Sequence, residues 1–455
     1  MRRLIAHLFA SCLVLTACAE VPEVPDGTPA AKPVIMGTRG PLTDKQSKAL
    51  FAKLGPDAQD MLQRHLAVEQ AVAETPLLAG NKTRILEDGP ATFRAMFEAI
   101  RAAHDHVNLE YFILEDVQSD GASLGDLLTA KRQQGVQINV IYDSYGSIDT
   151  PQPFFDRLTK AGINVLQYHP FNPLDAMAGG YSPNDRDHRK ILVVDGRLAI
   201  VGGVNLSTAY TSAGPGHPAR PDQPNTLPWR DTDMQIEGPA VAQLQHLFLD
   251  QWLGQKGPAL DSRTFFPVLA EKGKEAVRII GSSPDSGQPR FYVTLLSAIR
   301  TAQKRVWLNT AYFVPTHQEM EDLIAAARRG ADVRIVLPDA SDSTLAIDVQ
   351  HSRYEDLLEA GVRIYETHDQ ILHSKSAAID GVWSVIGSSN FDHRSVIFND
   401  EVDAVTVGGD TAKALEALFE KDFAKANRIE LAAWKERPFA EKMREIIART
   451  SQSML

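Results

Sequence analysis

Two stretches of the sequence carry a histidine, a lysine, an aspartate and an asparagine at the same spacing. The first is HRKILVVDGRLAIVGGVN, residues 188–205, and the second is HSKSAAIDGVWSVIGSSN, residues 373–390. In the first stretch the apolar run after the lysine predicts a buried strand, so that His188 and Lys190 project from the same face. A histidine can act as nucleophile, acid or base near neutral pH, and a neighbouring lysine supplies positive charge for a phosphate oxygen. This pair of residues is suited to chemistry at phosphorus.

The turn that ends each stretch adds further groups able to bind phosphate oxygens. These are backbone N–H groups, the side-chain amides of Asn205 and Asn390, and the hydroxyl of Ser388. One stretch makes half of a phosphate site. Two stretches brought together supply His188 and His373 on opposite sides of one phosphorus atom, with two lysines around it. That geometry suits in-line displacement through a phosphohistidine.

The rest of the chain is duplicated in the same way. FRAMFEAIRAAHDHVNLEYFIL from Phe93 is matched by YVTLLSAIRTAQKRVWLNTAYFV from Tyr292, each predicting a helix followed by a strand, and two further helix–strand pairs repeat likewise. Strands that alternate with helices indicate an α/β fold. We therefore expect two duplicated lobes, at 76–258 and 276–430. Each should be a mostly parallel sheet flanked by helices, with the active site at the pseudo-twofold lobe interface.

The spacing His-x-Lys, four residues, Asp, six residues, Gly-Gly/Ser-x-Asn, present twice, resembles the HKD motifs of the phospholipase D superfamily. The resemblance covers nearly the whole chain after the N-terminal region and is strongest to the bacterial cardiolipin synthase branch. It implies a catalytic pair in which His188 is the nucleophile and His373 the acid and base, with the reverse assignment as the alternative. Lys190 and Lys375 complete the catalytic set.

The family also places a carboxylate downstream of each motif to orient its histidine. Asp231 fits this role in the first half and Glu401 in the second. The motif aspartates, Asp195 and Asp380, belong to the catalytic motif by resemblance, but each closes a strand next to a glycine, and we expect them to hold the motif together. Gly203 stands where the second motif has a serine, so the first half lacks that hydroxyl.

The resemblance implies a phosphatidyl transferase or phospholipase D that acts on membrane glycerophospholipids, without a cofactor or metal ion because the lysines supply the charge. The alternative is a phosphodiesterase of another substrate, such as a nuclease. The formal net charge of -11 argues against a large nucleic-acid interface. All histidines, lysines and asparagines of both motifs are present, which argues against an inactive scaffold. Sequence alone separates neither transfer from hydrolysis nor one oligomeric state from another.

The N-terminus has the pattern of an export signal, with two arginines, an apolar run and small residues over 1–17. Leu15-Thr16-Ala17-Cys18 resembles a bacterial lipobox, which predicts lipidation of Cys18. Ala17-Cys18-Ala19 also fits ordinary secretory cleavage, the alternative. Residues 18–75 are expected to form a lipidated, extended tether and a helical segment. We therefore expect an exported, membrane-anchored lipoprotein on the periplasmic side, with outer-membrane sorting as a further hypothesis because Ala19 is not aspartate.

Three segments outside the repeats have two interpretations each. The Gly/Pro-rich insertions at 170–187 and 211–228 are either lids beside the site or surface loops. The tail, 431–455, is predicted to be helical, and one face of it is apolar with basic residues on its flanks. That face either rests on lipid or packs on the body. Its residues are Phe439, Met443, Ile446 and Ile447, flanked by Lys435, Arg437, Lys442 and Arg444.

Overall fold

The computed structural model describes residues 21, 23–24, 30–52, 56–170, 184–211, 227–286 and 288–450. The predicted signal peptide, Cys18 and most of both Gly/Pro-rich insertions lie outside these ranges. Within them, no helix is both long enough and apolar enough to cross a membrane.

The first lobe is built on a sheet of seven strands that carries the first motif near its middle. In spatial order these are β3 (Leu77–Leu86), β13 (Asp233–Glu237), β11 (Leu198–Gly202), β10 (Lys190–Val194), β4 (His106–Tyr111), β7 (Gln137–Asp143) and β8 (Asn164–Tyr168). The first motif forms β10 and β11, which explains its apolar character: both strands are covered on both faces.

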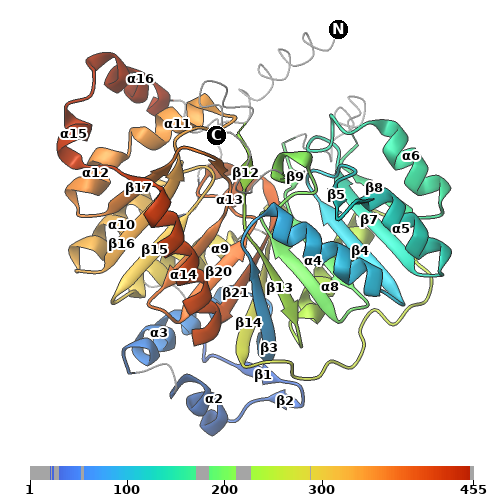
Figure 1. The fold of residues 1–455 in the computed structure, drawn as a ribbon. Helices are drawn as coiled ribbons and strands as arrows, with labels where there is room; N and C mark the ends of the chain where they lie inside the picture. The colour runs from blue at the N-terminus through green and yellow to red at the C-terminus, as the bar shows by residue number, and fades with distance from the viewer. Residues whose placement is uncertain are drawn as a thin grey trace.

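The second lobe repeats this order strand for strand. Its sheet runs β14 (Glu275–Ser282), β21 (Asn399–Val407), β20 (Trp383–Gly387), β19 (Ser376–Ile379), β15 (Arg305–Asn309), β16 (Asp332–Pro338) and β17 (Arg363–Thr367), with β22 (Asn427–Arg428) added at the edge. β3 and β14, the first strands of the two lobes, pair antiparallel with each other. One sheet therefore passes through both lobes, and the pseudo-twofold axis lies at this pair (Figure 1).

The predicted α/β fold with two duplicated lobes is confirmed, but the expectation of mostly parallel sheets is wrong. Among the seven described strands of each lobe sheet, only β4–β7–β8 and β15–β16–β17 are parallel. Helical crossovers link these strands, whereas the two motif strands of each lobe are joined by a tight turn, which requires antiparallel pairing. The remaining pairs of the two lobe sheets are antiparallel. The sheet is mixed.

Helices cover both faces of this sheet. α4 (Gly89–Ala102) shows why they do: Phe93, Met96, Phe97 and Ile100 recur at helical spacing and are all buried, and Asp88 caps the helix by accepting from Ala91 N. The other covering helices are α5 (Leu124–Gln133), α6 (Gln152–Lys160), α8 (Val241–Gly254), α9 (Arg290–Thr301), α10 (His317–Arg328), α11 (Thr344–His351), α12 (Tyr354–Glu359), α13 (His393–Ile397) and α14 (Gly409–Lys425).

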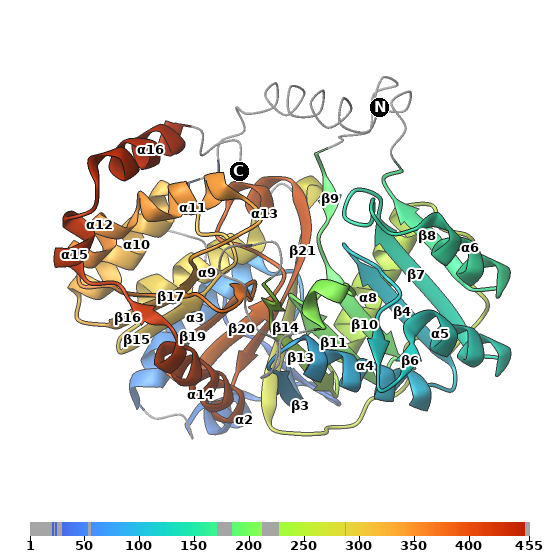
Figure 2. The ribbon, with the colours of Figure 1, turned by 45° about the horizontal axis from the view of Figure 1, so that its top comes forward.

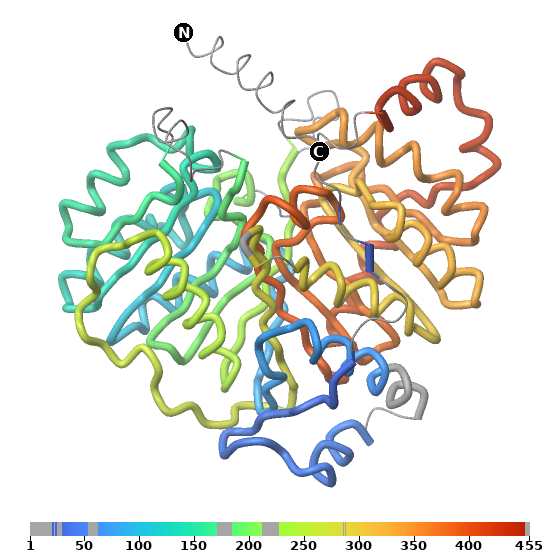
Figure 3. The backbone as a smooth tube through the Cα atoms, turned by 180° about the vertical axis from the view of Figure 1, so that it is seen from behind, coloured from blue at the N-terminus to red at the C-terminus, as the bar shows by residue number. Residues whose placement is uncertain are grey.

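Part of the expected tether is folded onto the body instead of being extended. β1 (Ile35–Gly37) pairs parallel with β3 and antiparallel with β2 (Gly40–Pro41). Burial of apolar side chains holds this segment on the body: Ile35 joins the core of the second lobe, and Val24 packs with Tyr292 and Leu296. The helices α2 (Asp44–Phe51) and α3 (Pro56–Val72) follow, and this N-terminal part lies beneath the lobe junction when seen from behind (Figure 3).

Several short elements complete the chain. The strands are β5 (Gln118–Ser119), β6 (Ala122–Ser123), β9 (Arg186–Asp187), β12 (Trp229–Arg230) and β18 (Ile371–Leu372); the 3-10 helices are η3 (Thr208–Tyr210) and η5 (Pro284–Ser286); the C-terminal helices are α15 (Leu431–Lys435) and α16 (Phe439–Thr450).

Candidate active site

The sheet places the two histidine–lysine pairs at equivalent positions of the two lobes. His188 lies two residues before Lys190, the first residue of β10, while His373 and Lys375 lie between β18 and β19. β10 and β19 run antiparallel to β4 and β15, so their starts lie at the carboxyl ends of those strands. All four side chains are buried, the most exposed residue being His188 at 9%. Each pair therefore lies at the edge where sites of α/β sheets form.

Two short bridging strands attach each motif to the opposite lobe. β9, immediately before His188, pairs with the start of β21 of the second lobe, and the His188 backbone N–H donates to Asp400 O at 2.9 Å. In the mirrored position, β12 of the first lobe pairs with β18, and the His373 backbone N–H donates to Arg230 O at 2.8 Å. These contacts place His188 beside Glu401, the residue after Asp400, and His373 beside Asp231, the residue after Arg230.

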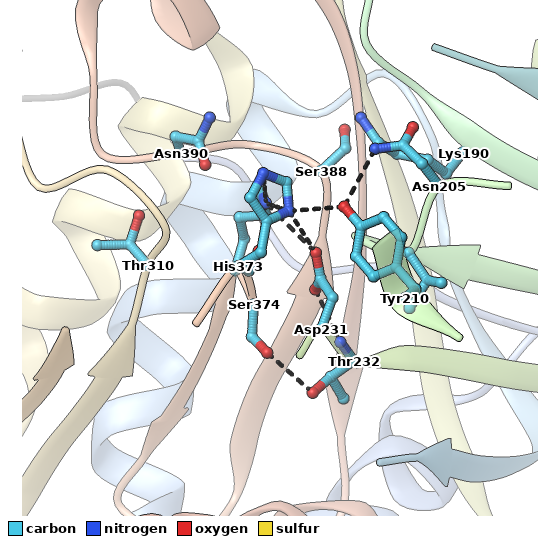
Figure 4. Close-up of polar contacts among 12 residues, drawn as sticks. Lys190, Asn205, Tyr210, Asp231, Thr232, Thr310, His373, Ser374, Ser388 and Asn390 are labelled. Carbon is cyan, nitrogen blue, oxygen red and sulfur yellow. Dashed lines mark hydrogen bonds and ion pairs between the residues drawn. The ribbon is translucent and has the colours of Figure 1, made fainter. Parts of the chain in front are cut away.

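As a result, each histidine pairs with a carboxylate of the other lobe, an arrangement we call crossed pairing. His188 Nδ1 lies 3.0 Å from both carboxylate oxygens of Glu401, and His373 Nδ1 lies 2.7 Å from Asp231 Oδ2 (Figure 4 draws the second pair). The expectation that each carboxylate orients the histidine of its own half is wrong, because the bridging strands put Glu401 next to His188 and Asp231 next to His373.

The electrostatics of the site keep both imidazoles neutral. Burial lowers the pKa of His188 to about 4, against the opposing charge of Glu401, and burial together with the nearby Lys375 lowers the pKa of His373 to about 4. In the tautomer that donates Nδ1–H to the carboxylate, each ring has its lone pair on Nε2. The structure thus offers two unprotonated ring nitrogens at neutral pH, which is the state a nucleophile or a base requires.

The lysines lie against the backbone of their own motif. Lys190 Nζ donates to His188 O at 2.5 Å, and Lys375 Nζ donates to His373 O and to Asp231 Oδ2, the latter at 3.4 Å. Burial lowers the pKa of Lys190 to about 7 and also lowers that of Lys375. A phosphodiester anion bound beside them would favour the charged form of both.

The predicted phosphate contact requires a free hydroxyl on Ser388, but this hydroxyl is engaged by the protein. The Ser388 hydroxyl donates to Glu401 Oε2 and accepts from Val402 N at 2.9 Å, so it holds the carboxylate that holds His188. At the equivalent position of the first lobe a Cβ added to Gly203 would lie 2.2 Å from Asp231 Oδ1. The serine–glycine difference between the motifs therefore matches the difference between a glutamate and a shorter aspartate.

The two motif asparagines have different surroundings. Asn205 Nδ2 donates to the Tyr210 hydroxyl at 3.3 Å, and its Oδ1 accepts from Ile113 N at 3.1 Å. Asn390 donates its backbone N–H to Ser395 Oγ at 3.0 Å, and its side-chain Oδ1 has no hydrogen-bond partner among the described residues. Asn390 is therefore the freer of the two to contact a substrate.

Asp195 and Asp380 lie at the far ends of their strands from the histidines. Both have left-handed backbone, with φ of 51° and 53°. Asp195 accepts the backbone N–H groups of 104–106, and Asp380 those of 303–305. Their position supports the structural interpretation, since each fixes the start of the neighbouring strand, β4 or β15.

Sequence reasoning missed the aromatic residues around the histidines. The Tyr210 hydroxyl lies 3.1 Å from His373 Nδ1, and the Trp229 ring lies 4.6 Å from the His373 ring (Figure 4 labels Tyr210). Phe112 contacts His188 edge-on at 5.1 Å, and Tyr312 lies 6.0 Å from His373. Phe112 and Tyr312 both belong to the repeated Tyr-Phe stretches, a signal that was present in the repeat.

A buried cluster of charges below His188 was also missed. Arg189 Nη1 lies 3.4 Å from Glu110 Oε1 and its Nη2 lies 3.6 Å from Asp400 Oδ1, while the Tyr168 hydroxyl donates to Asp400 Oδ2 at 3.0 Å. Because these partners come from both lobes, the cluster fixes the lobe interface under the first motif. Among the described residues, no group of three or more histidine, cysteine, aspartate or glutamate side chains is arranged to hold a metal ion.

The duplicated fold and the paired motifs define an enzyme of the phospholipase D type. Residues 96–213 and 295–423 match the family described as "Cardiolipin synthase, PLD-like domain", and the chain belongs to this family.

The comparisons with known proteins extend over most of the chain. It is 32% identical over 393 residues to a cardiolipin synthase of Geobacillus thermodenitrificans, covering 86% of this chain and 75% of the relative. It is 36% identical over 359 residues to cardiolipin synthase A of Pseudomonas fluorescens, covering 78% and 71%. A solved phosphatidylserine synthase of Haemophilus influenzae has the same fold, with a TM-score of 0.61 at 13% identity over 87% of this chain and 100% of that one.

Proposed function

We propose that the protein transfers the phosphatidyl group of a membrane glycerophospholipid to an alcohol, the reaction class for which its cardiolipin synthase relatives are named, or to water. The observation that carries the proposal is the crossed arrangement at the lobe interface. It joins two neutral histidines, each held by a carboxylate of the other lobe, with a lysine beside each.

In the proposed reaction, Nε2 of His188 attacks phosphorus, since its Nδ1 is held by Glu401. A P–N bond forms and the P–O bond to the head-group alcohol breaks. The negative charge of the bound phosphodiester favours the protonated form of His373, which gives its proton to the leaving oxygen. Neutral His373 then takes the proton of the incoming hydroxyl, whose oxygen attacks phosphorus and releases His188. Glu401 and Asp231 stabilise the imidazolium forms, and the two lysines stabilise charge on the phosphate oxygens.

We also propose export and anchoring through acyl groups on Cys18, on the N-terminal sequence pattern described above. A tether would keep the enzyme near a donor that is already in the bilayer, and outer-membrane sorting remains part of this proposal. Intact-mass analysis of the purified chain and of Cys18→Ala tests it. Acyl groups on the unaltered chain alone support the anchor, and their absence from both contradicts it.

The reaction is tested with the full chain and phosphatidylglycerol vesicles, with products identified by mass spectrometry. Cardiolipin with released glycerol indicates transfer, phosphatidic acid indicates hydrolysis, and His188→Asn should form neither. Intact phospholipid together with cleavage of a single-stranded oligonucleotide by the same preparation would overturn the proposal in favour of a nuclease.

A further inference from the structure

The C-terminal helix α16 packs on the body through its polar side. Its buried residues are Glu445 and Ala448, whereas its large apolar side chains point away from the protein. The exposed fractions are Phe439 77%, Met443 38%, Ile446 56% and Ile447 62%. At 100° per residue these four span an arc of about 100° opposite the buried side. The sequence left two interpretations of this apolar face, contact with lipid or packing on the body. Packing of the face on the body is wrong, because its four side chains are exposed.

Specific contacts fix the helix in this orientation. Arg437, in the link from α15, forms a paired salt bridge with Glu445 and stacks on Trp434, with its guanidinium carbon 3.2 Å from the ring centroid. Arg444 Nε donates to Asp348 Oδ1 of α11 at 2.8 Å. These contacts hold the polar side of α16 against the body. The apolar side therefore faces outward.

The helix lies at the same edge of the molecule as the active site. Ala448 packs in a small apolar cluster with Ala346 and Val349 of α11, against which Tyr312 also packs. Tyr312 lies 6.0 Å from the His373 ring. α16 therefore packs on α11, and both share a small cluster with Tyr312 of the site; Figure 2 shows α16 beside α11.

The equivalent edge of the first lobe also exposes apolar side chains. Tyr145 and Ile148 follow the carboxyl end of β7 and are 53% and 66% exposed. β7 is the counterpart of β16, whose carboxyl end leads into α11. Apolar side chains thus lie outward on both sides of the two histidines.

Basic side chains border the apolar arc of α16. Lys442 and Arg449 lie along one border, whereas Arg444, on the opposite flank, is paired with Asp348. An apolar arc with lysine or arginine at its borders is typical of helices that lie in the interface of an anionic bilayer, where the basic groups reach phosphate head groups.

We propose that α16 lies in the head-group layer of an anionic phospholipid bilayer, with Phe439, Met443, Ile446 and Ile447 inserted and the edge that carries the active site facing the lipid surface. The choice of a bilayer over a second protein rests on the proposed function. Docking would deliver the donor lipid laterally to His188 and His373, without a transfer through water.

The test uses the full chain carrying Cys18→Ala, so that acyl groups do not supply affinity. Glutamine replaces the four apolar residues of α16 in the test variant, and it replaces Leu253 and Val268, which are 71% and 95% exposed elsewhere, in the control variant. Partition onto vesicles of phosphatidylcholine and phosphatidylglycerol should fall at least about tenfold in the test variant and stay unchanged in the control. Equal melting temperatures verify folding.

Activity separates docking from chemistry. Turnover of bilayer phosphatidylglycerol should fall with partition, whereas turnover of a short-chain phospholipid dissolved as monomers should not. Unchanged vesicle partition overturns the proposal, and so does a change in sedimentation coefficient without a change in partition, which would make the face a self-association surface. Lost partition in a protein that turns over neither lipid supports docking and overturns the proposed function instead.

Discussion

Glu401→Gln tests the crossed pairing most directly. The variant keeps the shape of the side chain but removes the charge that faces Nδ1 of His188, which lies in the other lobe. A hydrogen bond to a charged partner contributes about 1.5–3 kcal/mol, and that contact is needed most when the imidazolium forms. Turnover should therefore fall by about ten- to 150-fold. Asp231→Asn should act in the same way through His373.

The loss of turnover alone does not show which histidine is affected, so the assay reads the ring protons. Protons shared between Nδ1 and a carboxylate appear far downfield in the NMR spectrum, and His188→Asn and His373→Asn assign the two signals. Glu401→Gln should move or remove the His188 signal and leave that of His373 unchanged. Asp322→Asn, which changes a carboxylate paired with Arg300 outside the site, is the matched control and should move neither.

The opposite result refutes the reasoning. If Glu401→Gln moves the His373 signal and spares that of His188, the pairs lie within the lobes and the bridging strands do not set them. A decrease in turnover below about threefold would show that the carboxylate charge does not reach the imidazolium.

Four further predictions follow from the site. His188→Asn should carry no adduct, whereas His373→Asn, given a donor whose leaving group needs no proton, should stall as a phosphatidyl adduct seen by intact mass after alkaline quench. Tyr210→Phe removes the hydroxyl beside His373 Nδ1 and should lower kcat about two- to tenfold with KM unchanged. Gly203→Ala should displace Asp231 and lower kcat at least about tenfold, measured with melting temperature. Activity should survive EDTA, since lysines supply the positive charge.

Each of these has a result that contradicts it. An adduct on His188→Asn alone would exchange the roles of the two histidines. A Tyr210→Phe enzyme with normal kcat would remove the tyrosine from the positioning of His373. Normal turnover by Gly203→Ala would show that Asp231 has room to move. Complete loss of activity with EDTA that added metal restores would overturn the mechanism.

The sequence was most informative where a pattern was repeated. The paired motifs and the repeated helix–strand segments predicted two lobes, and the structure brings His188, Lys190, His373 and Lys375 to their interface. The mixed sheet was missed because the helix–strand rhythm of 93–168 was extended to the motif strands, which a short turn joins.

The crossed pairs could not be predicted from the sequence. Asp231 follows His188 in the same half of the chain, and no local pattern indicates that the Asp231 side chain contacts His373 of the other lobe. The information is in β12 and β18, two-residue strands whose pairing involves residues more than 130 positions apart. The Ser388 contact lies within the second lobe, where Ser388 follows β20 and Glu401 belongs to the paired strand β21. The outward face of α16 was undecided for a related reason: an amphipathic pattern identifies an apolar side but not what covers it.

The bridging strands have a consequence for how such a chain can change. Each lobe alone contains an imidazole without its carboxylate and a carboxylate without its imidazole, so a separated lobe is not half of an enzyme. A substitution at Asp231, in the first lobe, changes the surroundings of His373 in the second lobe. The two duplicated halves therefore cannot change independently at these positions. Within each lobe the residue that meets the carboxylate differs with it: a serine contacts Glu401, whereas a glycine leaves room for Asp231.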